Sequence, residues 1–141
     1  ADRLRGLSGP RFFSMVPVQV ICLLPDDRES CRVRGILKTF PLFCARDIPL
    51  TEDSIERILK VRADLFLLND RINGQESFAL IEEAEWPGEV IIVSRDPALG
   101  VKAFEKGVAG FLIHPVTPEK MALALWRAYE RLWFRGRTET Y

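Results

Sequence analysis

The sequence predicts one α/β domain in which five strands alternate with five helices and form a doubly wound parallel sheet. Two observations lead to this prediction. Five short apolar runs recur along the 141 residues, and a segment with apolar residues at helical spacing follows each run. The runs are mostly continuous rather than alternating, which is typical of strands covered by helices on both faces. We expect the strands at residues 18–24, 41–45, 65–68, 89–94 and 110–113.

The first predicted strand leads directly into a polar loop. Residues 18–24 are largely apolar, and the run ends at Pro25, Asp26 and Asp27, which favour a loop. Helical spacing then indicates the first helix. The apolar residues on its inner face are Val33, Ile36, Leu37 and Phe40.

The next two strands are shorter than the first. Residues 41–45 form the second strand, and Thr51 is the expected cap of the helix after it. The third strand, 65–68, is followed by the pair Asn73-Gly74, which is typical of a turn. The residues that indicate the two helices are Ile55, Ile58 and Leu59, then Phe78 and Ile81.

The last two strands are followed by helices with clear boundaries. The helix after residues 89–94 is expected to stop at Gly107. The residues that indicate it are Leu99, Ala103 and Phe104. After the fifth strand, Thr117 is a cap, Pro118 suits the first helical position, and Glu119 suits the helix dipole.

Composition narrows the class of protein. Lys plus Arg and Asp plus Glu are 20 each, so no net field favours nucleic acid or an anionic membrane. No apolar run approaches the ~20 residues of a membrane helix. The cysteines are odd in number and accompany one histidine, which disfavours a zinc site or a disulfide framework and favours the cytoplasm. We expect small buried side chains at Cys22, Cys31 and Cys44.

The predicted domain covers residues 17–135. Glycine, serine and proline interrupt residues 1–16, so we expect an N-terminal extension there: a flexible arm or an expression leftover, with a docking arm as the alternative. Residues 136–141 are expected to be a tail or the start of a linker. No cofactor is expected.

Polar residues at the ends of the predicted strands are the candidate functional residues, because the crevice of such folds lies at the carboxyl ends of the strands. These residues are Asp26, Asp27, Asn69, Ser94 and His114.

The segment from Ser94 to Pro115 resembles the second half of response-regulator receiver domains, the CheY-like domains with a flavodoxin-like fold. Within it, residues 103–107 are most similar to receivers that precede LytTR-type DNA-binding domains. The third strand and its loop also resemble the receiver pattern. The likeness implies a signalling module, with a DNA- or RNA-binding output domain as a possible attached partner outside this chain.

The resemblance implies a phosphoacceptor pocket that is degenerate here. Receivers carry an acidic pair for Mg²⁺ after the first strand, an aspartate acceptor after the third, Ser or Thr after the fourth, and Lys-Pro after the fifth. The matching positions in this sequence are Pro25 with Asp26 and Asp27, then Asn69, Ser94, and His114 with Pro115. Phe111 matches the aromatic residue linked to switching.

Two of these substitutions remove chemistry. The carboxamide of Asn69 cannot form an acyl phosphate as a carboxylate does. The imidazole of His114 is a poor substitute for a lysine ammonium. Any Mg²⁺ binding at Asp26 and Asp27 would be weak. We therefore expect a non-enzymatic pseudo-receiver that acts without phosphorylation.

Two alternatives remain open. A relocated acid such as Asp70 would make the domain a phosphoryl-accepting receiver, although a shift of one residue points a strand side chain to the opposite face. A small flavodoxin-like nucleotide-binding protein or enzyme is the other alternative, but no glycine-rich phosphate loop follows the first strand.

The last helix carries the best signal for an interface. One apolar stripe is formed by Met121, Leu125, Ala128 and Leu132. A second, aromatic stripe is formed by Trp126, Tyr129 and Trp133. One domain core can hardly absorb both, and aromatic residues often anchor interfaces. We expect these residues to bind a protein partner or a second copy of the chain, without membrane contact and without direct nucleic-acid binding.

Overall fold

The computed structural model describes the backbone of residues 16–83 and 85–139, and side chains as far as residue 134. Almost all of the predicted N-terminal extension therefore lies outside the described residues, as does the end of the predicted tail. The last helix continues to Glu139.

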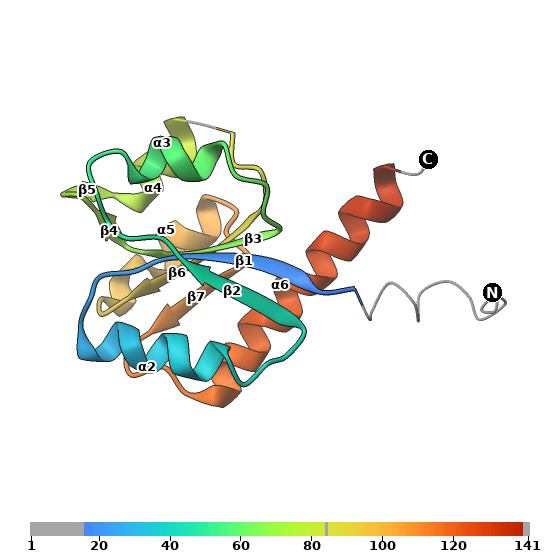
Figure 1. The fold of residues 1–141 in the computed structure, drawn as a ribbon, viewed down its shortest axis with the longest axis horizontal. Helices are drawn as coiled ribbons and strands as arrows, with labels where there is room; N and C mark the ends of the chain where they lie inside the picture. Colours follow the sequence, from blue (N-terminus) through green and yellow to red (C-terminus); the bar gives the residue numbers. More distant parts are fainter. Residues whose placement is uncertain (1–15, 84, 140–141) are drawn as a thin grey trace, which may run out of the picture.

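The described chain forms a five-stranded parallel sheet, which confirms the predicted fold class (Figure 1). The strands are β1 (Val18–Leu23), β2 (Phe43–Asp47), β3 (Leu65–Asn69), β6 (Glu89–Ser94) and β7 (Gly110–Ile113). Their order is β2-β1-β3-β6-β7. The second strand begins two residues later than predicted. Phe43 N–H donates to the carbonyl of Phe40 in a turn, and the strand starts only after that turn.

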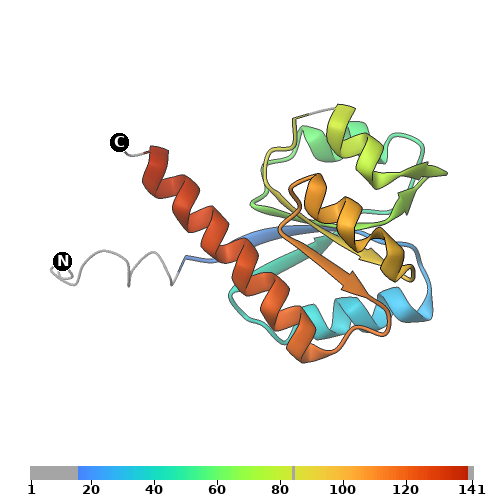
Figure 2. The ribbon, with the colours of Figure 1, turned by 180° about the vertical axis from the view of Figure 1, so that it is seen from behind.

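Two helices cover one face of the sheet and three cover the other (Figures 1 and 2). The first face carries α2 (Arg28–Leu37) and α6 (Pro118–Glu139). The second face carries α3 (Ser54–Leu59), α4 (Ser77–Glu83) and α5 (Gly100–Glu105), the last preceded by the 3-10 turn η1 (Pro97–Leu99). The carboxyl-terminal end of α6 projects beyond the sheet (Figure 2).

The protein has one hydrophobic core on each face of the sheet, because successive side chains of the central strands point to opposite faces. Leu65 and Leu67 of β3 face α2 and α6, whereas Phe66 and Leu68 face the other three helices. All four side chains are buried, because β3 lies in the middle of the sheet. A central parallel strand is covered on both faces and therefore appears as a continuous apolar run in the sequence.

The turn at Asn73-Gly74 is part of a small hairpin that the sequence did not reveal. Asn73 has φ of 51° and Gly74 has φ of 83°, the left-handed conformation that two-residue hairpin turns require. The hairpin strands are β4 (Arg71–Ile72) and β5 (Gln75–Glu76). They are too short to give a periodic pattern.

Two predictions at the periphery are wrong. Cys31 and Cys44 are exposed, because Cys31 lies on the outer side of α2 and Cys44 on the edge strand β2; Cys22 is buried as expected. The N-cap position of α3 is Asp53 rather than Thr51. Thr51 stands before the helix, where its hydroxyl donates to Asp53 Oδ1 over 2.6 Å.

Candidate functional site

The carboxyl ends of the central strands bring most of the predicted site residues to one edge of the sheet. Asn69 at the end of β3 lies opposite Val93 of β6, so Asp70 stands beside Ser94. The backbone N–H of His114, just after β7, donates to the carbonyl of Ser94 over 3.0 Å.

Asn69 is engaged with its own loop. Its Nδ2 donates to the carbonyl of Arg71 over 2.9 Å, and its backbone carbonyl accepts from the hydroxyl of Ser77. The side-chain amide thus closes the turn after β3, which is a common role of asparagine at a strand end. No carboxylate stands at this position.

Asp70, rather than Asn69, is the partner of Ser94. The buried Ser94 hydroxyl donates to Asp70 Oδ2 over 2.7 Å and accepts from the backbone N–H of Asp96 over 3.0 Å. Asp70 is itself fixed, since its N–H donates to the carbonyl of Val93 over 2.9 Å. The sequence suggested Asp70 only as a displaced acceptor and did not indicate this contact.

In the first loop, Asp27 caps the helix that follows. Its Oδ1 accepts from the backbone N–H of Ser30 over 2.8 Å, which is the N-cap bond of α2. This hydrogen bond, with a smaller contribution from Arg95, holds the pKa of the Asp27 carboxyl below its ordinary value. Asp26 is exposed, and Pro25 contributes its carbonyl to the loop.

Arg95 is the site residue that the sequence did not single out. Its guanidinium lies 3.5 Å from Asp27 Oδ2 and forms an ion pair with Glu29 in the first turn of α2. The hydrogen bond to Glu29 raises the pKa of Arg95. Arg95 directly follows Ser94, so its place near the site could have been inferred from the sequence. Its partners could not, because Glu29 and Asp27 lie 66 and 68 residues earlier in the chain.

A second arginine holds the same loop. Arg34 of α2 donates to the carbonyl of Leu24 over 3.0 Å and to that of Pro25 over 3.2 Å. Its Nε also donates to Asp47 Oδ1 over 2.9 Å, at the end of β2. The backbone of the first loop is therefore fixed from within the protein.

The Mg²⁺ site implied by the resemblance does not fit these residues. Asp27 is committed to the helix cap and to Arg95, and the carbonyl of Arg71 accepts from Asn69. Among the side chains of residues 16–83 and 85–134, no three of His, Cys, Asp or Glu are grouped to hold a metal ion. A divalent ion prefers several oxygen ligands, and here protein donors engage the carboxylate of Asp27 and the carbonyl of Arg71.

The remaining predicted site residues lie at the end of β7. His114 is half-buried and forms a cis peptide with the exposed Pro115. Phe111 is half-buried and packs against the core that is covered by α3, α4 and α5.

Two residues of the predicted interface on α6 are buried instead. Met121 and Leu125 are 0% and 2% exposed and lie in the core against the sheet, so they cannot contact a partner. Leu132 packs partly against the same core. Trp126 is 59% exposed and stacks on Tyr129, with ring centroids 6.4 Å apart.

The aromatic stripe is thus only partly exposed. Tyr129 also meets the Phe43 ring edge-on, with centroids 6.4 Å apart, and Trp133 is half-buried. The other stripe, formed by Met121, Leu125, Ala128 and Leu132, faces the sheet and packs in the core on this side.

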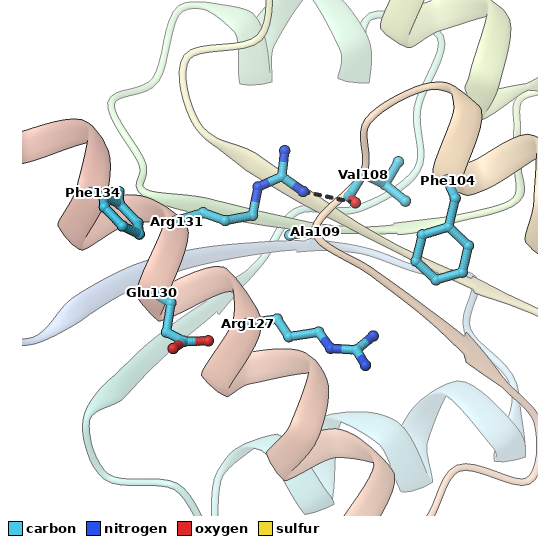
Figure 3. A pocket seen from close by; sticks show the side chains of 7 residues that line it. All are labelled: Phe104, Val108, Ala109, Arg127, Glu130, Arg131 and Phe134. Carbon is cyan, nitrogen blue, oxygen red and sulfur yellow. Dashed lines mark hydrogen bonds between the residues drawn. The ribbon is translucent and has the colours of Figure 1, made fainter. Parts of the chain in front are cut away.

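An open groove of ≈ 360 Å³ separates α6 from α5 and the loop before β7 (Figure 3). Its rim includes the exposed rings of Phe104 and Phe134. The other lining residues are Val108, Ala109, Arg127, Glu130 and Arg131. The sequence used Phe104 to identify a helix but did not indicate that its ring faces outward.

No helix among the described residues is both long enough and apolar enough to cross a membrane.

Comparison with known proteins identifies the fold. No protein-family model and no curated protein matches the sequence. Among solved structures, a signal receiver domain from Vibrio parahaemolyticus is similar with a TM-score of 0.72 and 17% identity, over 88% of this chain and 98% of that one.

Two further structures agree. A receiver domain of an HD domain-containing protein from Pseudomonas fluorescens gives a TM-score of 0.71 at 17% identity, over 87% of this chain and 93% of that one. A CheY-like receiver domain from Methanospirillum hungatei gives 0.67 at 16% identity, over 84% and 98%. The chain therefore has the flavodoxin-like fold of response-regulator receiver domains.

Proposed function

We propose that this chain is a pseudo-receiver: a non-enzymatic signalling module that acts through protein–protein contacts and dimerisation, without phosphorylation. Asn69 carries the proposal. The resemblance places an acceptor carboxylate at the end of β3. The residue at this position is Asn69, whose amide donates to the carbonyl of Arg71. An amide is not the nucleophile that acyl-phosphate formation requires.

The surrounding charges support the same conclusion. A phosphoryl group brings negative charge, which a nearby cation must neutralise. Arg95 is already paired with Asp27 and Glu29, and His114 stands where the resemblance places a lysine.

The strongest competing function is a receiver with a relocated acceptor at Asp70. The 2.7 Å contact with Ser94 favours it, because the resemblance gives this serine position a role at the acceptor. The position of Asp70 disfavours it, because Asp70 follows the last residue of β3, and the resemblance places the acceptor at that last residue, Asn69. A nucleotide-binding protein or enzyme would need to place phosphates beside the acidic first loop.

Exposed apolar residues on α5 and α6 support dimerisation as the mode of action. The large exposed ones on these helices are Val101, Phe104, Leu123, Trp126 and Phe134. Aromatic residues are enriched at protein contacts, and a two-fold dimer is the simplest form of such a contact between copies of one chain. The cysteine usage favours the cytoplasm, and the resemblance favours an attached DNA- or RNA-binding output domain outside this chain.

Treatment with acetyl phosphate and Mg²⁺, followed by intact mass spectrometry, tests the proposal. We expect no phosphoryl adduct on the wild-type chain. An adduct that disappears in Asp70→Asn but persists in Asp26→Asn would establish the relocated acceptor instead.

A further inference from the structure

We propose that the strand-end site supplies its own ions: Arg95 takes the place of a divalent cation, and Asp70 takes the place of an anionic ligand of Ser94. The loops around the site are then held in one arrangement without any external ion. This inference rests on the proposed function, because it describes how the same site is regulated.

The cation part rests on the position of Arg95. Its guanidinium joins the loop after β6 to Asp27 and Glu29, which lie at the start of α2. A guanidinium presents several N–H donors in a planar fork and can serve two carboxylates at once. The Arg95 side chain is 62% exposed, so solvent screens each pair. Arg95 therefore occupies the carboxylates of Asp27 and Glu29 but contributes little to the stability of the whole fold.

Other N–H donors satisfy the neighbouring oxygen atoms. Arg34 donates to the carbonyls of Leu24 and Pro25, and Asn69 donates to that of Arg71. A divalent ion at this edge would have to displace both Arg95 and Asn69 from these oxygens. Mg²⁺ gives up its own water reluctantly, so that exchange is unfavourable.

The anion part rests on the hydroxyl of Ser94. A serine hydroxyl has one donor proton, and here that proton goes to Asp70 Oδ2 over 2.7 Å. The same oxygen accepts from the N–H of Asp96 over 3.0 Å, which ties the loop after β6 to this hydroxyl. An external anion would have to take the Ser94 proton from Asp70. It would also meet the negative charges of Asp70 and of the first loop.

The cation part is tested with Mg²⁺ on the full chain. Melting temperatures are compared for wild type, Arg95→Ala and Arg62→Ala, with NaCl at equal ionic strength as the salt control. Arg62 is an exposed arginine just before β3, at the opposite edge of the sheet. We expect no Mg²⁺ effect on wild type or Arg62→Ala. For Arg95→Ala we expect a rise of ~3 °C at ~10 mM Mg²⁺, since the freed carboxylates can then bind it weakly.

Two results would overturn the cation part: stabilisation of the wild type by Mg²⁺ to the same extent as Arg95→Ala, or an Arg95→Ala variant that remains insensitive to Mg²⁺.

The anion part is tested with sulfate, followed through amide chemical shifts of Ser94 and Asp96 in NMR spectra. Asp70→Ala is compared with Asp26→Ala, which removes an equal charge from the exposed first loop. Alanine removes the oxygen that accepts the Ser94 proton, so we expect saturable shifts in Asp70→Ala only. Equal chemical-shift changes in both variants would show that sulfate responds only to net charge, and would overturn this part. Sulfate binding by the wild type would also overturn it.

These outcomes are distinct from those of the phosphorylation experiment. A wild-type chain that binds Mg²⁺ but takes no phosphoryl group refutes only the built-in cation. A phosphoryl adduct on the wild type refutes the proposed function.

Discussion

Arg131 of α6 and Glu89 at the start of β6 form an ion pair, with Nε and Oε1 3.1 Å apart. Glu89 is 4% exposed, so its carboxylate lies inside the protein beside the groove. The same guanidinium donates to the carbonyl of Val108 over 2.9 Å (Figure 3). It also donates to the carbonyl of Gly107 over 2.8 Å. One side chain thus fixes α6 against the sheet and against the end of α5.

Arg131→Ala should therefore destabilise the domain more than a surface arginine would. We expect a loss of about 1–3 kcal/mol in the free energy of unfolding, because a buried carboxylate loses a partner and two carbonyls lose donors. The measurement is urea denaturation. Arg127→Ala, at another exposed arginine on the same groove, is the matched control and should change the free energy by less than about 0.5 kcal/mol. Equal effects of the two substitutions would contradict this account.

Stability should fall at low pH, partly through Asp27. Its hydrogen bond from Ser30 and its pairing with Arg95 lower its pKa in the folded state below the ordinary 3.8. A lowered folded pKa means that the stabilisation is complete above the unfolded pKa. It is then lost as the pH falls through the folded pKa.

Two variants separate the charge of Asp27 from its capping role. Asp27→Asn keeps an acceptor for the helix cap and should lose little stability at neutral pH, but its stability should fall less between about pH 5 and about pH 2. Asp27→Ala should cost ~1 kcal/mol at neutral pH, because the cap is lost. Urea midpoints against pH test both. An Asp27→Asn curve with the wild-type slope would show that other carboxyl groups dominate.

Two glycines should respond to alanine in opposite directions. Gly35 lies inside α2, and a Cβ there would meet no atom within 4 Å. Gly35→Ala should stabilise the protein by ~0.5–1 kcal/mol, since glycine is a poor helix former. A Cβ at Gly88 would lie 2.5 Å from the carbonyl oxygen of Asp64, so Gly88→Ala should destabilise it. Thermal melting compares the two variants. Stabilisation by both would contradict this prediction and would show that the backbone before β6 can shift to make room for the Cβ.

The fold could be predicted from the sequence because each central strand is buried on both faces. Leu65 to Leu68 form a short continuous apolar run, which is typical of such a strand. Edge positions gave no comparable signal. Cys44 is as apolar as a core residue but lies on β2, which has a neighbour on one side only.

The site could be predicted in its positions but not in its contacts. Strand ends indicated Asn69 and Ser94, since parallel strands bring their carboxyl ends to one edge. The partners of Arg95 depend on how α2 stands beside the loop after β6, which no local pattern encodes. The same limit explains the error on α6. Helical spacing indicated two stripes on α6 but not that the stripe with Met121 is the one that faces the sheet.

Truncation of Trp126 should separate assembly from folding. The side chain is 59% exposed and stacks on Tyr129, whereas Met121, on the same helix, is fully buried. If the exposed face of α6 is the dimer contact, Trp126→Ala should weaken dimerisation by ~2 kcal/mol, or about 30-fold in Kd. Its effect on the free energy of unfolding of the monomer should stay within about 0.5 kcal/mol. The wild-type dimer should form without any phosphodonor.

Met121→Ala provides the contrasting variant for the same helix. It removes a core side chain and should cost about 2–5 kcal/mol in stability. Sedimentation velocity over a range of protein concentrations measures association, and urea denaturation measures folding. A wild-type chain that sediments as a monomer at ~100 µM would refute the dimer, since even a contact of modest affinity should be populated there. Strong destabilisation by Trp126→Ala would instead mean that its stacking on Tyr129 holds α6 in place, and the contact surface would have to lie nearer Phe104 and Phe134.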